Sequence, residues 1–168
     1  IPLRLVGSEM CIRDRVNRIG VFATQATVNS GAYKKELMKY NSALEVCELA
    51  CPDWVPIVES GNYDNPESIA AVEMHVEEML KFAPDKIILG CTHYPYLMSL
   101  LTKFAPKELF IDPAKIFVEY IKNDFESLGL LNNSQTAGYE KMFVSANPES
   151  FTEHSKIFYE LHKTPELA

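Results

Sequence analysis

Apolar runs alternate with amphipathic stretches along the chain, and this alternation predicts strands separated by helices. Five short apolar runs bounded by polar or turn residues predict strands at 18–23, 43–50, 86–89, 108–113 and 141–146. Helical periodicity between them predicts helices at 28–40, 66–83, 95–104, 114–129 and 148–161. Strands separated by helices indicate βαβ crossovers, so we expect an α/β fold with a mostly parallel sheet and helices on its faces.

Two of these segments carry specific local signals. Asn65 before Pro66 is typical of a helix start, since Asn caps a helix and Pro suits its first turn. One apolar stripe follows, made of Ile69, Val72, Val76, Met79 and Leu80. Residues 55–60 (VPIVES) instead predict a short extended piece that brings Glu59 to a loop closed by Gly61.

Composition narrows the class of protein. The 168 residues are 47% hydrophobic and 23% charged, as expected for a soluble globular protein of one or two small lobes. A net charge of -7, without a long basic cluster, argues against nucleic acid or an anionic membrane surface as partner. No apolar run is long enough to span a membrane. The four cysteines are expected to be reduced thiols in a cytosol, because a chain with this apolar content needs no disulfides.

The first 16 residues differ from the rest of the chain. They have neither helical nor strand periodicity and lack the apolar core of a secretory signal. The stretch LVGSEMCIRDR resembles translated sequencing-adapter DNA, so we expect 1–16 to be a non-native segment. The alternative is a natural disordered N-terminus.

Chemistry is concentrated in Gly90-Cys91-Thr92-His93, which directly follows the strand predicted at 86–89. In α/β folds, ligands bind in the loops at the carboxyl ends of the strands. Backbone N–H groups there can stabilise a thiolate, and a thiolate can exchange a proton with a bound substrate.

Other roles for these residue types remain open at this point. Cys47 and Cys51 lie in and after a predicted strand, which favours buried structural thiols. Zinc needs three or four converging ligands, and the spacing of Cys91 and His93 with the other cysteines and histidines shows no convergence, so we expect no metal. Acyl transfer usually places the base far from the cysteine in sequence, unlike this pair. We expect His75 and His154 to be solvated on helix faces.

Five segments in order resemble bacterial glutamate racemases. They are IGVFATQATVNSGAY, ACPDWVPIVES, ILGCTHYPYL, FIDPA and MFVSANPESF, and the resemblance covers residues 17 to 161. The hexapeptide Gly90–Pro95 is specific to the glutamate branch, since the related aspartate racemases have Gly-Cys-Thr-Glu at this point.

The resemblance implies a cofactor-independent enzyme that interconverts L- and D-glutamate with two cysteines on opposite faces of the α-carbon. It implies that Cys91 is the base acting on L-glutamate, that Thr92 and His93 contact the substrate, and that His93 with Glu59 tunes proton transfer. Thr27 matches a threonine placed against the substrate carboxylate, and Thr24 is a second candidate. Glu59 as a solvated carboxylate and Thr27 as only a helix cap stay open as alternatives.

The family's other cysteine and its Asp-Ser and Pro-Tyr-Gly segments do not occur in this sequence. We therefore expect an α/β lobe at 17–112 and, at 113–168, segments of a second, incomplete lobe, with apolar stripes at 116–125 and 151–161 left exposed. The chain alone should bind glutamate weakly and not racemise it. The full-length protein should be a cytoplasmic homodimer that supplies D-glutamate for peptidoglycan. The alternative is a natural truncated homologue that acts as a binding or regulatory module.

Overall fold

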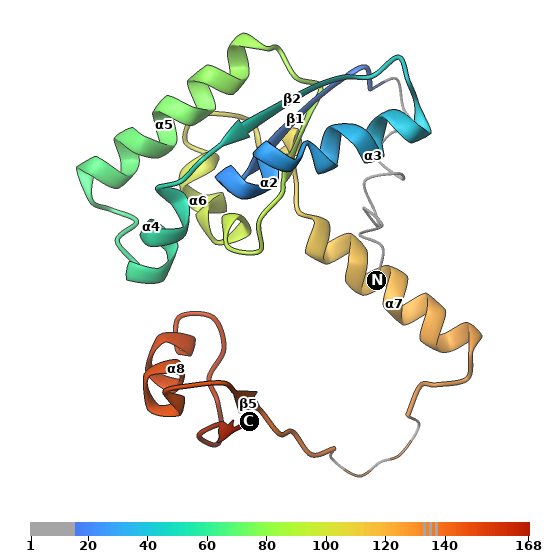
Figure 1. Ribbon diagram of the computed structural model, residues 1–168, viewed down its shortest axis with the longest axis vertical. Coiled ribbons are helices and arrows are strands. Elements are labelled where there is room, and N and C mark those ends of the chain that lie inside the picture. The colour runs from blue at the N-terminus through green and yellow to red at the C-terminus, as the bar shows by residue number, and fades with distance from the viewer. Residues whose placement is uncertain (1–15, 133, 135, 137) are drawn as a thin grey trace. The chain divides into compact units, whose positions relative to one another are not determined.

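The computed structural model describes residues 16–132, 134, 136 and 138–168, and these form two compact units that divide after Gly129. The expected non-native segment thus lies almost wholly outside the described residues. The first unit is built on one parallel sheet with the strand order β2-β1-β3-β4 (Figure 1). Its strands are β1 (Arg18–Ala23), β2 (Glu45–Ala50), β3 (Lys86–Leu89) and β4 (Phe110–Ile111). The predicted α/β class and parallel sheet are confirmed.

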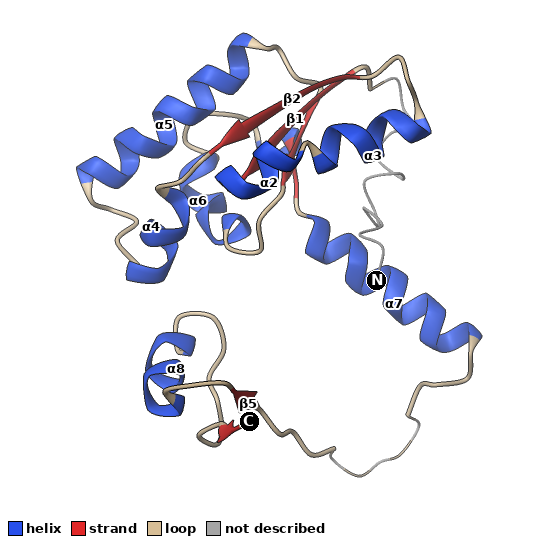
Figure 2. Cartoon of the chain, viewed as in Figure 1, coloured by secondary structure: helices blue, strands red, loops and turns tan. Residues whose placement is uncertain are grey.

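Helices cover both faces of this sheet (Figure 2). The helices of this unit are α2 (Gln25–Ser30), α3 (Ala32–Tyr40), α4 (Trp54–Ser60), α5 (Pro66–Lys81), η1 (Tyr94–Leu97), α6 (Met98–Leu101), η2 (Lys107–Leu109) and α7 (Pro113–Ser127). Helix α7 leads away from the sheet (Figure 2) and has no buried residue. On one face, Leu37 of α3 joins Val21 and Ile88 of the central strands in the core. On the other, α5 comes so close that a Cβ on Gly20 would lie 2.5 Å from the Met79 sulfur. A glycine in β1 therefore permits this close approach.

The core on the α5 side is aromatic. The ring of Trp54 lies 4.7 Å from that of Phe22 and 4.9 Å from that of Tyr94, measured between centroids, and all three side chains are fully buried. His75 packs edge-on against Trp54 and is only 7% exposed, so the prediction of a solvated histidine was wrong. Its Nδ1 pairs with the Ala71 carbonyl at 2.7 Å, which satisfies the imidazole inside the protein.

Residues 54–60 form helix α4, so the prediction of an extended piece was wrong as well. Trp54, Ile57 and Val58 are the buried residues of this helix, and their spacing is that of one helical face. Pro56 is compatible with the first turn, where a backbone N–H has no intrahelical acceptor. Gly61 ends the helix in the left-handed conformation with φ 67°.

Two other helices differ from their predicted extents. The helix expected at 28–40 begins at Gln25, with Thr24 as its N-cap, and is broken by Gly31 at φ 58° into α2 and α3. The helix expected at 95–104 is a 3₁₀ turn, η1, followed by the single turn of α6.

The second unit, Leu130–Ala168, is small. The short strands β5 (Phe143–Val144) and β6 (Glu166–Leu167) pair in parallel, and α8 (Pro148–Ser155) lies between them in the sequence. The helix ends at Ser155, earlier than expected, and β6 has no counterpart in the sequence prediction. Large apolar side chains of both predicted stripes are exposed, among them Phe117 and Tyr120 of α7 and Phe151 in α8.

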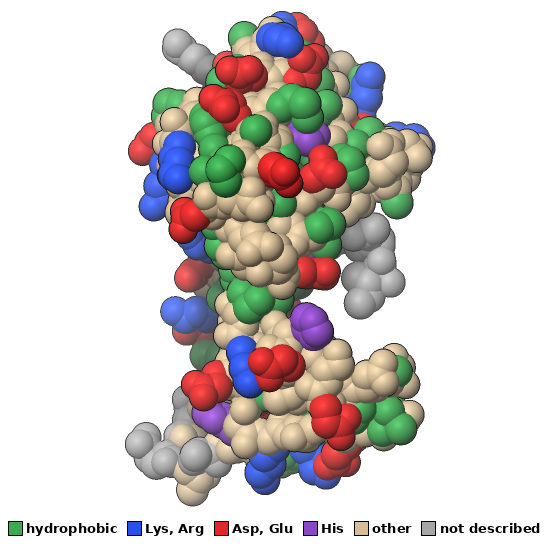
Figure 3. All heavy atoms as spheres, turned by 90° about the vertical axis from the view of Figure 1, so that its left-hand side faces the viewer, with side chains coloured by type: hydrophobic (Ala, Val, Ile, Leu, Met, Phe, Trp, Pro, Cys, Tyr) green, Lys and Arg blue, Asp and Glu red, His purple; other side chains and the backbone are tan. Residues whose placement is uncertain are grey.

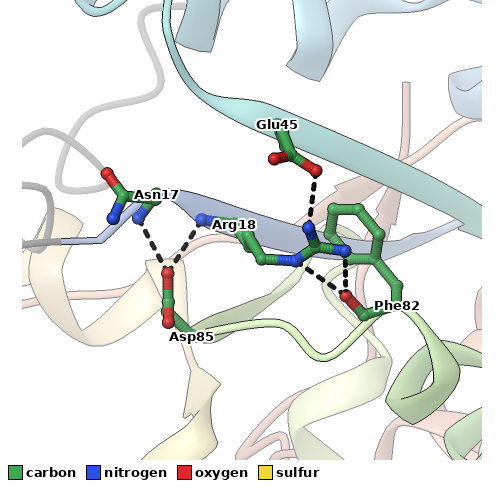
Figure 4. A network of polar contacts seen from close by, with 5 residues as sticks. All are labelled: Asn17, Arg18, Glu45, Phe82 and Asp85. Atoms are coloured by element: carbon green, nitrogen blue, oxygen red, sulfur yellow. Dashed lines mark hydrogen bonds and ion pairs between the residues drawn. The ribbon is translucent and has the colours of Figure 1, made fainter.

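The amino end of the sheet in the first unit is closed by a polar network (Figure 4). One carboxylate oxygen of Asp85 accepts from the backbone N–H groups of Asn17 and Arg18 at 2.7 and 2.8 Å. The Arg18 guanidinium donates twice to the Phe82 carbonyl and once to Glu45. The two backbone donors, with a smaller contribution from the Arg18 charge, lower the pKa of Asp85. These contacts tie the starts of β1, β2 and β3 together.

The face that carries α4 and α5 mixes acidic, basic and apolar side chains (Figure 3). In the described part of the chain, no helix combines the length and apolar character that crossing a bilayer requires.

Candidate active site

Cys91 stands where the chain leaves the sheet after β3. The Gly90 N–H donates to the Phe22 carbonyl of neighbouring β1 at 2.7 Å. A Cβ on residue 90 would lie 2.9 Å from that carbonyl oxygen and 3.0 Å from the Tyr33 ring. A glycine is therefore needed at this position, and it sets the partly buried Cys91 at the carboxyl edge of the sheet.

Three of the predicted residues lie in series at this edge. The Cys91 sulfur is 3.9 Å from Nδ1 of His93, and Nε2 of His93 is 3.3 Å from a carboxylate oxygen of Glu59. The His93 side chain is 30% exposed and that of Glu59 is 58% exposed. Glu59 lies in helix α4 and not in the predicted extended piece, but the helix still places it beside the loop, as the site prediction requires. An imidazole between a thiol and a carboxylate can hold or pass a proton.

The loop that carries these groups is anchored by the residue that follows His93. Tyr94 is fully buried, and its hydroxyl donates to the Cys51 carbonyl at 2.9 Å. Burial raises the pKa of this phenol, and the nearby thiols of Cys51 and Cys91 raise it further. Tyr94 thus stays a donor and ties the loop to the segment that leads into α4.

The loop after β1 lies at the same edge of the sheet, since β1 and β3 are parallel neighbours. The Thr24 hydroxyl caps α2 by accepting from the Thr27 N–H at 3.4 Å, and the two hydroxyls lie 3.0 Å apart. Thr24 is therefore the helix cap, whereas Thr27 lies inside α2. Thr92 is exposed in the neighbouring loop.

The other described thiols are placed differently. Burial raises the pKa of Cys51, and the Asp53 carboxylate raises it further; its sulfur lies 3.7 Å from the Leu49 carbonyl oxygen. Burial likewise raises the pKa of Cys47 in β2, with added repulsion from Glu78 and Glu48. Both thiols are therefore held in the neutral form. No group of three or more possible metal ligands occurs among the residues that the structure describes.

Two residues near Cys91 were not predicted as site residues. Tyr33 of α3 has its ring against Gly90, and Glu48 of β2 lies beneath the α2–α3 turn. Side chains alternate between the two faces of a strand, so Glu48 lies on the same face of β2 as Val46, which packs against the core. Only the folded chain brings Tyr33 to Gly90.

Residues 7–121 match the family model described as Asp/Glu/Hydantoin racemase. The chain belongs to this family. Among its racemase relatives, a curated glutamate racemase of Chlorobaculum parvum is 36% identical over 154 residues, covering 90% of this chain and 57% of the relative. The chain thus spans little more than half the length of that relative.

Solved racemase structures share the fold. Glutamate racemase isoform RacE1 from Bacillus anthracis superposes with a TM-score of 0.81 at 25% identity, over 98% of this chain and 61% of that chain. Glutamate racemase from Thermus thermophilus in complex with β-chloro-D-alanine superposes with a TM-score of 0.77 at 27% identity, over 98% of this chain and 60% of the other. The resemblance found in the sequence motifs thus extends to the three-dimensional structure.

Proposed function

We propose that Cys91 is the acid–base thiol for one face of the glutamate α-carbon in a cofactor-independent glutamate racemase. The observation that carries this proposal is the series Cys91, His93 and Glu59 at the carboxyl edge of the sheet. Membership of the racemase family and the glutamate racemase relatives support the reaction class. The bound β-chloro-D-alanine of the Thermus thermophilus enzyme supports an amino-acid ligand.

The proposed step is a proton transfer. The Cys91 thiolate removes the α-proton of L-glutamate and becomes a thiol, while the electron pair of the broken C–H bond delocalises toward the α-carboxylate. His93 lies between the Cys91 sulfur and the Glu59 carboxylate, and together with that carboxylate it tunes this proton transfer. The hydroxyls of Thr27 and Thr24 are suited to donate to the α-carboxylate, where negative charge increases.

Inversion also needs a proton donor on the opposite face of the α-carbon. Among the described residues, Cys47 and Cys51 are the other thiols, and burial raises the pKa of both, which keeps them neutral. A single thiol that returns a proton to the face it came from exchanges the proton without inverting the centre. Racemisation, the supply of D-glutamate for peptidoglycan, the cytoplasmic location and the homodimer are therefore proposed for the whole protein.

Deuterium exchange tests the role of Cys91. The purified chain is incubated with L-glutamate in deuterated water, the α-proton signal is followed by NMR, and the enantiomers are separated by chiral chromatography. We expect slow exchange without accumulation of D-glutamate, and no exchange with Cys91→Ala.

Cys47→Ala is the matched control and should exchange like the parent chain. Exchange that persists in Cys91→Ala, or that disappears in Cys47→Ala, would show that the wrong thiol was assigned. Saturable glutamate binding without exchange would favour the alternative, a binding or regulatory module.

A further inference from the structure

Tyr33 contacts the turn that leads into Cys91. A Cβ on Gly90 would lie 3.0 Å from Cε2 and 3.1 Å from Cζ of Tyr33. Cζ is the ring carbon that carries the hydroxyl, so the polar end of the ring lies over Gly90. Because α3 is fixed to the core through Leu37, the ring position is fixed as well.

Glu48 brings a negative charge under the same region. Its Oε1 atom is buried and has no hydrogen-bond partner among the described residues. Its Oε2 atom lies 4.0 Å from the position of a Cβ on Gly31, two residues before Tyr33. A buried carboxylate oxygen that lacks a donor within the protein is uncommon and calls for a physical explanation.

Tyr33 lies within electrostatic reach of both acids. Burial raises the pKa of this phenol, and the charges of Cys91 and then Glu48 raise it further. The phenol is therefore protonated at neutral pH and has one hydrogen to donate, for which the Cys91 sulfur and the Glu48 carboxylate are candidate acceptors.

We propose that Tyr33 and Glu48 are positioning residues for Cys91, an inference that rests on the proposed function of that thiol. The Tyr33 ring supports the Gly90 turn, and its hydroxyl donates to the Cys91 thiolate. Glu48 opposes the thiolate, both by competing for this hydroxyl and by its charge. Together they set how readily Cys91 becomes a thiolate.

Other polar groups face the same region and stay constant in the test. His93 and Tyr94 approach Cys91 from its own loop. Lys35 of α3 reaches the Gly31 turn beside Glu48, with its Nζ atom also 4.0 Å from the Gly31 Cβ position. The Lys35 ammonium donates to the Ser30 carbonyl, and Oε1 of Glu48 has no hydrogen-bond partner among the described residues.

Alkylation of Cys91 tests the proposal without glutamate or turnover. The full chain is treated briefly with iodoacetamide across a pH series, and modification of the peptide that carries Cys91 is measured by mass spectrometry. Since iodoacetamide reacts with the thiolate, the midpoint of the profile reports thiolate formation. Tyr33→Phe should raise this midpoint by roughly one pH unit, and Glu48→Gln should lower it by a smaller amount.

Matched controls separate these effects from general changes in charge or packing. Tyr40→Phe removes a phenol at the other end of α3, and Glu45→Gln removes a carboxylate from β2 near Arg18. Neither should move the midpoint. A midpoint that stays in place with Tyr33→Phe, or that rises with Glu48→Gln, would overturn the proposal, and Glu48→Gln decides alone if the tyrosine variant misfolds. Failure of the racemase proposal would give a different result. The parent chain would then show no deuterium exchange with glutamate, while the alkylation midpoints of the two variants would still shift as expected.

Discussion

The two ends of the parallel sheet are built on opposite principles. At the amino end, the side chains of Asp85 and Arg18 make five hydrogen bonds at 2.5–2.9 Å, and the Arg18 guanidinium also lies over the Phe82 ring. At the carboxyl end, the contacts from His93 to Cys91 and to Glu59 are 3.9 and 3.3 Å long. These contacts between the reactive groups are thus longer than those of the network at the amino end.

This contrast separates stability from chemistry within one sheet. Groups that already have ideal partners gain little by turning to a ligand, while loosely paired groups can form new contacts when a substrate arrives. The Glu48 oxygen that lacks a hydrogen-bond partner among the described residues lies toward the reactive end as well. Changes at the carboxyl end should therefore alter proton exchange more than folding, and changes at the amino end should do the reverse.

The largest expected effect is on the chemistry of the carboxyl end. His93→Asn should slow α-proton exchange roughly hundredfold, since a positioned acid–base partner contributes about that much. Glu59→Gln should have a smaller effect, roughly tenfold, because Glu59 acts through His93. Exchange is measured in deuterated water, and the midpoint of thermal unfolding should be nearly unchanged, as both side chains are partly exposed. If His93→Asn exchanged the α-proton as fast as the parent chain, the assignment of chemistry to the carboxyl end would be wrong.

A moderate effect on stability is expected at the amino end. Arg18→Met keeps much of the apolar stem but leaves the Phe82 carbonyl without its side-chain donors, so we expect a loss of about 1–2 kcal/mol in the free energy of unfolding. Urea titration measures this loss. The control Lys39→Met removes an exposed ion pair with Glu36 and should cost less than about 0.5 kcal/mol. Equal losses of unfolding free energy in Arg18→Met and Lys39→Met would show that the network stabilises the fold no more than an exposed ion pair does.

The smallest expected effect is on how steeply the midpoint of thermal unfolding falls with pH. The pKa of Asp85 is lower in the folded chain than its ordinary value of 3.8, so its contribution to stability is present above that value. The contribution is lost as the pH falls through the lower folded pKa. Asp85→Asn should therefore flatten the acid decline of the unfolding midpoint below about pH 4. Asp64→Asn, in an exposed turn, is the control, and an identical decline in the parent and Asp85→Asn would count against the network.

Sequence patterns located the central strands because these are apolar runs with polar ends. The observed bounds of β1 and β3 are those predicted from RIGVFA and KIIL. Helix α4 escaped prediction because seven residues with a proline show too little periodicity to separate helix from strand. Its helical face becomes evident only once Trp54 is seen inside an aromatic cluster contributed by distant segments.

The candidate site divides in the same way. Cys91, His93 and Glu59 come from motifs readable along the chain, although their roles stay predictions. The Tyr33–Gly90 contact joins residues almost sixty positions apart, and the missing partner of Glu48 is a property of the packed interior. No local pattern encodes either, which is why both required the structure.

The strand order has a consequence for synthesis of the chain. β1 is central, pairing with β2 on one edge and β3 on the other, yet it precedes both in sequence. At ribosomal speeds of about 5–20 residues per second, the roughly sixty residues between β1 and β3 take several seconds to make. During that interval an apolar strand has an open edge in the nascent chain, so slowed growth or a holding chaperone during expression should raise the yield of soluble protein.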